Sequence, residues 1–194
     1  MSNLAYKLED SFTYADYLSW DDGMRYEIID GAAYVMDSPS ARHQRISREL
    51  AGVIWLFLKD KPNNICEVFP APFDVRLFPD ENYLDDTVMQ PDILVVCDKS
   101  KLADGRACKG APDLIIEILS QSSVLMDRKV KAEKYLKAGV REYWIVNPES
   151  LDILVNSLAD GRYVPTLYKD TVMSSVPPGL TVDLDAVRAN ATTS

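Results

Sequence analysis

The chain has 194 residues, of which 47% are hydrophobic and 26% are charged, and its formal net charge at pH 7 is -9. This composition excludes a largely disordered chain, and the length suits one sizeable core, so we expect a single domain over residues 1–194. The acidic balance opposes long-range attraction to nucleic acid, although a local basic face or a bound divalent cation can reverse the field at a site.

Local patterns predict alternating short helices and strands in the first half of the chain, after a loose leader at residues 1–11. They are a short capped helix from Thr13 to about Ser19, a β-hairpin at 26–36 around an Asp30-Gly31 turn, a helix over 41–59, and strands at 65–69, 73–78 and 88–97.

The second half continues the same alternation after a loop at 98–110. It is predicted to contain a strand at 113–119, a helix from about Ser122 to Ala138, a strand at 142–146, and a hairpin formed by 151–157 and 162–167. Residues from Ala186 onward are predicted to fray, as chain ends commonly do.

The location and redox state of the protein are predicted from what the sequence lacks. No stretch approaches the ~20 uninterrupted apolar residues that span a bilayer, and residues 1–10 lack the pattern of a signal peptide, so we expect a cytoplasmic protein. Cys66, Cys97 and Cys108 are odd in number and show no C-x-x-C spacing. Reduced, mostly buried thiols are therefore expected, not a disulfide framework or a four-ligand zinc site.

The apolar run 111–119 is interrupted by one carboxylate, Glu117. Burying it among Leu and Ile side chains costs on the order of 2 to 7 kcal/mol unless it is compensated, so a cation, a hydrogen-bonding partner or a metal ion must lie nearby. Two Pro-Asp pairs, Pro91-Asp92 and Pro112-Asp113, each precede an apolar strand. If these two strands pair antiparallel, with the loop 98–111 joining them symmetrically, Asp92 lies opposite Glu117 and their Cβ atoms are roughly 5 Å apart. Asp113 is ~13 Å from Glu117 along the same strand, so we give it a structural role.

The helix after this strand supplies a candidate counter-charge. One of its faces carries Val124, Asp127, Lys131, Tyr135 and Ala138, whereas Lys129 and Glu133 point elsewhere. A lone lysine on such a face would be expected to extend past the sheet to solvent. Directly after a strand that buries Glu117, Lys131 is instead predicted to compensate that carboxylate.

Four segments, 90–96, 111–120, 127–135 and 138–146, closely resemble the Uma family of restriction endonuclease-like proteins, within the PD-(D/E)XK nuclease superfamily. Residues 26–31 and Ser40-x-x-His43 also resemble it, so the similarity spans about 12–156. The resemblance implies an α/β (α+β mixed sheet) fold: a restriction endonuclease-like core with a mixed β-sheet flanked by helices, an extra N-terminal hairpin and C-terminal strands.

The resemblance also implies a metal-dependent endonuclease that hydrolyses DNA phosphodiester bonds. Asp92 and Glu117 would be its two acids, holding Mg²⁺ or Mn²⁺ together with a carbonyl near Ile118. In the superfamily the catalytic lysine usually lies two residues after the second acid, and this chain has Leu119 at that position. Lys131 on the following helix would take the place of that lysine and would orient or activate water.

Further residues are expected to support this site. Glu27 is either a third acidic ligand or a hairpin surface residue, Gln90 would orient a ligand or water, and Tyr135 and Asp127 share the face of Lys131. Two sets of residues are predicted to contact DNA phosphates. Arg42, His43 and Arg45 stand beside Arg48 at the start of the helix at 41–59, and Arg128 and Lys134 belong to a basic block on the later helix that also includes Lys129, Lys131, Lys137 and Arg141. A solvated helix end or an ordinary charged helix exterior explains these cations nearly as well.

Two other functions fit the sequence. The first is a catalytically silent DNA-associated or dimeric regulatory module on the same fold, which the net acidity favours. The second is a different hydrolase, against which stand the missing G-x-S-x-G, H-E-x-x-H and P-loop patterns and the single histidine. By analogy with nucleases that cut both strands, a homodimer through the strands after Glu142 is predicted, with neither a membrane partner nor an organic cofactor.

Overall fold

The computed structural model describes residues 11–120 and 126–191, and the side chains of 126–128 lie outside that description. The first half of the chain contains α1 (Tyr14–Tyr17), β1 (Tyr26–Ile29), β2 (Ala32–Val35), α2 (Ala41–Asp60), β3 (Glu67–Pro70), β4 (Asp74–Arg76), β5 (Val88–Met89) and β6 (Ile93–Val96).

The second half is richer in strands. It contains a 3-10 helix (Lys99–Leu102), β7 (Ala107–Lys109), β8 (Leu114–Ile118), a π-helical segment (Met126–Lys131), α3 (Ala132–Ala138), β9 (Glu142–Val146), β10 (Ile153–Ala159), β11 (Arg162–Tyr168), β12 (Thr171–Met173), β13 (Thr181–Asp183) and α4 (Leu184–Ala191).

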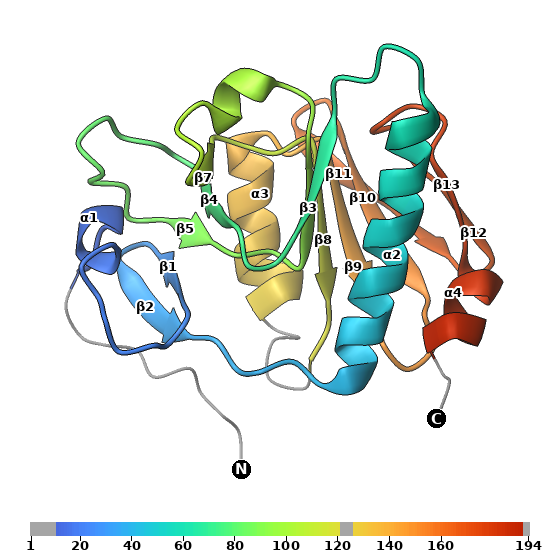
Figure 1. Ribbon diagram of the computed structural model, residues 1–194, viewed down its shortest axis with the longest axis horizontal. Coiled ribbons are helices and arrows are strands. Elements are labelled where there is room, and N and C mark those ends of the chain that lie inside the picture. The colour runs from blue at the N-terminus through green and yellow to red at the C-terminus, as the bar shows by residue number, and fades with distance from the viewer. Residues whose placement is uncertain (1–10, 121–125, 192–194) are drawn as a thin grey trace.

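The strands form a six-stranded mixed sheet, a five-stranded sheet and a small two-stranded sheet. The six-stranded sheet has the order β11-β10-β9-β8-β6-β3, and the five-stranded sheet has the order β2-β1-β5-β4-β7. In the six-stranded sheet only β8 and β9 run parallel, and α3 lies between them in the chain. Helix α3 covers one face of this sheet and α2 with α4 cover the other (Figure 1). The predicted mixed sheet flanked by helices is confirmed.

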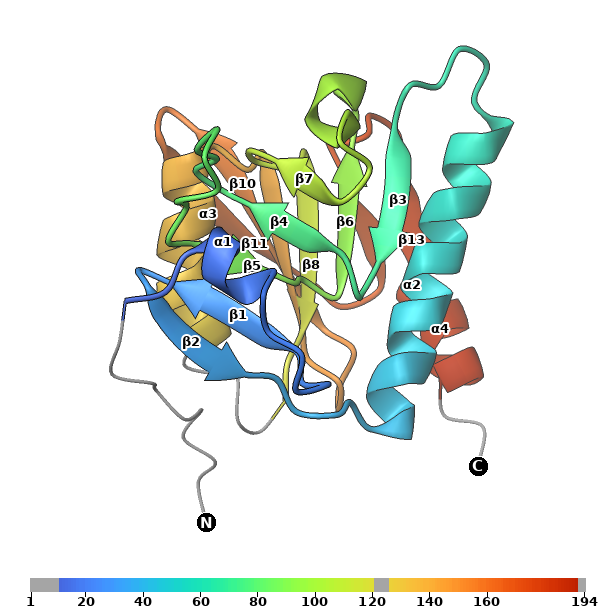
Figure 2. The ribbon, with the colours of Figure 1, turned by 60° about the vertical axis from the view of Figure 1, so that its left-hand side comes forward.

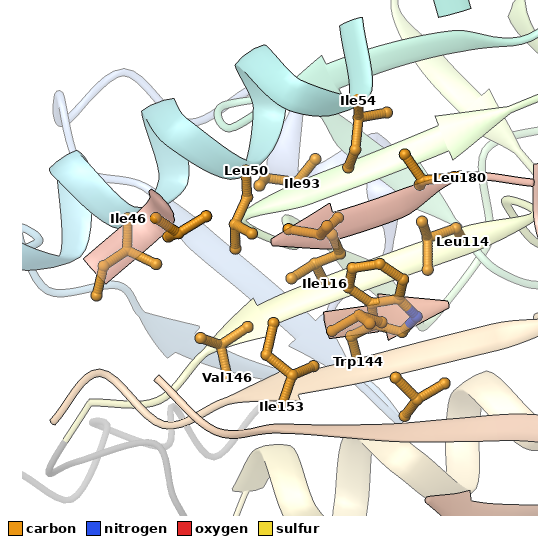
Figure 3. Packing of buried hydrophobic residues seen from close by; sticks show 14 of the residues in the cluster. Ile46, Leu50, Ile54, Ile93, Leu114, Ile116, Trp144, Val146, Ile153 and Leu180 are labelled. Carbon is orange, nitrogen blue, oxygen red and sulfur yellow. The ribbon is translucent and has the colours of Figure 1, made fainter. Parts of the chain in front are cut away.

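The main core lies between the six-stranded sheet and α2. Side chains at four-residue steps on α2 (Ile46, Leu50 and Ile54) pack against Ile116 and Trp144 of the sheet, as Figure 3 shows. All five are fully buried. The helix begins with the Ser40 hydroxyl accepting a hydrogen bond from the His43 amide.

Three predicted elements differ in the structure. The helix predicted from about Ser122 to Ala138 is π-helical over Met126–Lys131 and α-helical over Ala132–Ala138, and its predicted start at 122–125 lies outside the described residues. The strand predicted at 88–97 is divided into β5, in the five-stranded sheet, and β6, in the six-stranded sheet. Pro91, in the break between them, has no N–H to donate to a ladder, and the chain passes there from one sheet to the other. The loop predicted at 98–110 contains the 3-10 helix and β7. The N-terminal hairpin is confirmed, with Asp30 and Gly31 both at positive φ, and stands forward in Figure 2.

Two predictions about the cysteines and the tail were wrong. Cys66 and Cys97 form a disulfide, and Cys108 alone is free and buried. The two cysteines come just before β3 and just after β6, whose antiparallel register pairs Glu67 with Val96, so the pairing continues by one position. The tail does not fray at Ala186, because α4 continues to Ala191, where burial of its apolar side stabilises it.

The described part of the chain, 11–120 and 126–191, was searched for helices of the length and apolarity needed to cross a membrane, and it contains none.

Candidate active site

The two acids of the predicted site meet where β6 and β8 pair. Ile93 faces Ile116 and Leu94 faces Ile115, so the next position of the ladder places Asp92 opposite Glu117. The Asp92 carboxylate lies against β8, where Oδ2 accepts a hydrogen bond of 2.7 Å from the Ile118 amide. The predicted register of these strands is confirmed.

Lys131 lies between two buried carboxylates. Its Nζ is 2.9 Å from Oε1 of Glu27 and 3.0 Å from Oε1 of Glu117, and all three side chains are 8% exposed or less. An isolated charge at this depth would be strongly destabilised, and the ammonium compensates both acids at once. The predicted partner of Glu117 is therefore in place.

Tyr135, one helical turn after Lys131, also binds Glu117. Its hydroxyl donates to Oε1 of Glu117 at 2.8 Å, and the ring is fully buried. Burial and the nearby Glu117 charge raise the pKa of Tyr135 well above its ordinary value. The hydroxyl therefore stays protonated and remains a hydrogen-bond donor to the carboxylate at physiological pH.

Glu27 and Gln90 extend this polar cluster into the five-stranded sheet. Glu27 lies on β1 and is 6% exposed, so it is not a hairpin surface residue. Its Oε1 also accepts a hydrogen bond from the Gln90 amide at 3.0 Å. The Gln90 side chain donates to Tyr17 and Asp74, two residues that the sequence patterns had not singled out. Burial raises the pKa of Asp74.

His43, on the first turn of α2, contacts the site directly. Its Nε2 lies 3.1 Å from Oδ2 of Asp92 and 3.1 Å from the carbonyl oxygen of Ile118. His43 therefore lies beside the first acid, and its contact with a DNA phosphate stays a prediction. In the sequence, the Ser40-x-x-His43 spacing indicated where His43 would lie, because a capping serine three residues earlier places His43 in the first turn of the helix.

Most of the cations predicted to meet DNA have partners within the protein. Arg42 donates to the carbonyl oxygens of Pro148 and Glu149, and Lys134 pairs with Asp30. In the same basic block, Arg141 pairs with Asp113 and Lys137 lies over the Phe78 ring. Arg45 is half-buried on α2. The side chains of Asp127 and Arg128 lie outside the described residues.

Asp113 has the structural role predicted for it. Its Oδ2 accepts a hydrogen bond from the Cys97 amide at 2.8 Å, and its Oδ1 lies 3.2 Å from Arg141. These contacts fix the start of β8 against the end of β6. They leave Asp113 apart from the cluster around Glu117.

A pocket of about 340 Å³ opens beside Asp92. It is lined by His43, Gln44, Ser47, Arg48, Ala51, Pro70, Ala71 and Asp92, so it lies between α2 and the chain that leaves β3. The Asp92 side chain is 20% exposed, whereas those of Glu117 and Lys131 are 5% and 6% exposed. Of the two acids, Asp92 is therefore the one that faces this pocket beside α2.

The donor set is of the type that Mg²⁺ prefers. The Asp92 carboxylate and the Ile118 carbonyl both face His43 Nε2 at 3.1 Å, so an ion held by both would take the place of that nitrogen, and Glu117 is the neighbouring residue of β8. Hard oxygen donors of this kind fit a magnesium or manganese ion. Within the described residues, no group of three or more His, Cys, Asp or Glu side chains is arranged to hold a metal unaided, so waters or substrate oxygens would complete the shell.

Comparison with known proteins identifies the family. The structure is similar to the crystal structure of a "putative nuclease belonging to DUF820" from Anabaena variabilis ATCC 29413, with a TM-score of 0.72, 20% sequence identity and coverage of 93% of this chain and 99% of that one. None of the curated proteins compared with the sequence matches it. The family model Uma2, described as "Putative restriction endonuclease", matches residues 14–188. The chain therefore belongs to the Uma2 family.

Proposed function

We propose that the protein is a metal-dependent endonuclease that hydrolyses DNA phosphodiester bonds at the cluster of Asp92, Glu117 and Lys131. The observation that carries the proposal is the position of Lys131, whose ammonium lies buried between Glu27 and Glu117 beside the partly exposed Asp92. A lysine and two acids at one end of a β-strand pair combine metal ligands with a group that can stabilise negative charge.

Mg²⁺ or Mn²⁺ would be held by Asp92, Glu117 and the Ile118 carbonyl. When bound, the ion polarises the scissile phosphate and lowers the pKa of an attacking water. Glu27 would position Lys131, because its Oε1 accepts hydrogen bonds from the Lys131 ammonium and the Gln90 backbone amide, and its role as a third ligand stays a prediction.

The chain's own groups supply the remaining chemistry. Lys131 would orient the attacking water and offset the charge that develops on the phosphate. Tyr135 keeps its proton and holds the Glu117 carboxylate by a hydrogen bond, which fixes that acid for its role. His43, beside Asp92, would hold the orientation of that carboxylate at the mouth of the pocket.

The test is a nicking assay on supercoiled plasmid and on labelled duplex DNA with Mg²⁺ or Mn²⁺. Asp92→Asn, Glu117→Gln and Lys131→Arg are each expected to lower the rate by at least about 100-fold, because each removes a metal ligand or the positioned ammonium. Asp113→Asn is the matched control, since it changes the other Pro-Asp pair and should leave the rate unchanged. Thermal unfolding of each variant checks that it is folded.

Cleavage that persists in all three folded variants would show that the site is wrong or that the activity belongs to a contaminant. The alternative function, a DNA-associated or dimeric module without catalysis, is favoured by the missing three-residue metal group among the described residues. A folded wild type that binds DNA but neither binds Mn²⁺ nor cuts any substrate would support it. Light scattering on the same samples tests the predicted homodimer.

A further inference from the structure

The pocket beside Asp92 continues along α2 as a groove. A second pocket of about 270 Å³ is lined by Ala51, Gly52, Trp55, Val68 and Pro70, and it shares Ala51 and Pro70 with the first. Together they form what we call the α2 groove, between α2 and the edge strand β3, which lie side by side in Figure 2. A ligand bound along it would end at Asp92.

The spacing of residues on α2 makes this groove one continuous face. Gln44, Arg48, Gly52, Trp55 and Lys59 follow one another at steps of three or four, so they lie on the same side of the helix. At 1.5 Å per residue they extend over roughly 22 Å. A stretch of several nucleotides could follow this face.

The groove does not share the acidic excess of the chain, because one cation, Arg48, balances one carboxylate, Asp92, in its lining. Of the described residues that line its two pockets, Asp92 is the one carboxylate, whereas the chain carries a net charge of -9. Arg48 is 66% exposed and pairs with its neighbour Glu49. An exposed pair of this kind is weak, so a phosphate can replace it. Lys59 adds a second cation at the far end.

Trp55 offers an exposed aromatic surface within the groove. It is 51% exposed, and its ring lies 4.8 Å from the Lys59 ammonium. Gly52, one helical turn before it, has open space where a Cβ would stand. An exposed indole beside empty space and a cation is the arrangement on which unpaired bases stack. Bases inside a duplex do not offer their faces in this way.

We propose that the α2 groove binds an unpaired segment of the substrate strand, with a base stacked on Trp55 and the backbone passing Arg48 to reach Asp92. The inference rests on the proposed nuclease function and assigns it a substrate class: DNA with a single-stranded segment next to the cleavage point.

Binding is measured by fluorescence anisotropy with fluorescein-labelled oligothymidine and with a labelled blunt duplex, in the Glu117→Gln protein so that nothing is cut. Trp55→Ala is expected to weaken oligothymidine binding by about tenfold, and Trp55→Phe to restore most of it. Gly52→Arg tests the space itself: although it adds a cation, its side chain fills the groove and should also weaken binding. Leu56→Ala is the matched control, because Leu56 is 54% exposed on the same turn but outside the groove.

Equal affinities of the Trp55→Ala and Leu56→Ala proteins for oligothymidine would overturn the inference. So would a change of oligomeric state in Trp55→Ala, since the groove would then hold a second copy of the chain. Cleavage by the wild type is measured separately. If the wild type cuts DNA and Trp55→Ala binds oligothymidine normally, the role of the groove is wrong and the nuclease function stands. If binding depends on Trp55 but the wild type cuts no DNA, the nuclease function is wrong and the groove still binds single strands.

Discussion

Lys131 and Glu27, separated by 104 residues in the chain, form a buried ion pair with a Nζ to Oε1 distance of 2.9 Å. Glu27 comes from β1 of the five-stranded sheet, and Lys131 comes from the helical segment that covers the six-stranded sheet. The ion pair therefore connects the two sheets. The Lys131 ammonium also pairs with Glu117, so both the stability of this region and the chemistry proposed for it depend on the Lys131 side chain.

Replacing Lys131 with Met should destabilise the fold by about 3 to 5 kcal/mol, because two buried carboxylates lose their counter-charge. Urea unfolding followed by circular dichroism measures this. Adding Glu27→Gln to Lys131→Met should restore part of the loss, since one of the uncompensated charges is then removed. The control is Lys134→Met, whose partner Asp30 is exposed, with an expected change within about 1 kcal/mol. Equal effects of the two lysine variants would contradict the buried pair.

Metal binding should depend on Asp92 and not on Asp113. Calorimetric titration with Mn²⁺ is expected to show at least a tenfold weaker affinity for Asp92→Asn, which loses a charged oxygen ligand, and an unchanged affinity for Asp113→Asn. The two residues follow prolines at equivalent points of adjacent strands, so they are closely matched. A site that survives in Asp92→Asn would have to lie elsewhere on the chain.

The reactivity of the thiols should follow the disulfide and the burial of Cys108. Burial raises the pKa of the Cys108 thiol to about 12, which leaves almost no reactive thiolate at neutral pH. Ellman's reagent should therefore find no thiol in the native, non-reduced protein. Because two of the three cysteines form the disulfide, it should find one thiol after unfolding in guanidinium and three after reduction. Three thiols without reduction would argue against the Cys66–Cys97 pairing.

The buried Asp74 should make stability depend on pH in a defined direction. Burial raises its folded-state pKa above the ordinary 3.8, so the stability that its protonated form contributes is present below that value and is lost as pH rises through the folded pKa. Asp74→Asn removes this loss. The difference in the free energy of unfolding, variant minus wild type, should therefore be larger at pH 7 than at pH 4. Altered hydrogen bonds to Tyr14 and Gln90 add a cost that is the same at both pH values.

Asp16 provides a control of opposite sign for that measurement. Hydrogen bonds from the Thr13 side chain and backbone lower the pKa of Asp16, so its ionised form stabilises the fold above the ordinary pKa. Asp16→Asn should then lose stability relative to the wild type as pH rises. The Asp16 change falls below about pH 4, where its lowered pKa lies, whereas the Asp74 change falls above the ordinary pKa. If both variants changed in the same direction as pH rises through these ranges, burial of Asp74 would not be the cause.

The part of the site that could be predicted depends on short-range periodicity. The two Pro-Asp strands are joined by a short connection, so their antiparallel register, and with it the approach of Asp92 to Glu117, follows from the chain itself. The helical repeat likewise places Lys131 and Tyr135 on one buried face, with Lys129 and Glu133 exposed. A carboxylate in an apolar strand then requires a compensating partner, and Lys131 is the cation within reach.

Contacts between distant segments could not be predicted in this way. The pairing of Cys66 with Cys97 depends on β3 lying beside β6, which cysteine counting does not reveal. The apparent basic surface of the helix depends on Asp30 and Asp113, which reach Lys134 and Arg141 only in the folded chain.

The sequence by itself determined most of the helices and strands, and the strand pair that carries Asp92 and Glu117, because these follow from local repeats and short connections. Its motifs carried the resemblance to the family. The tertiary structure alone decided that Glu27 is buried against Lys131 and that His43 lies beside Asp92. It also decided that Asp92 lines a pocket beside α2. The physical reason is that hydrophobic burial brings two sheets and a helix together, and this packing, which no local repeat encodes, selects the charges that meet.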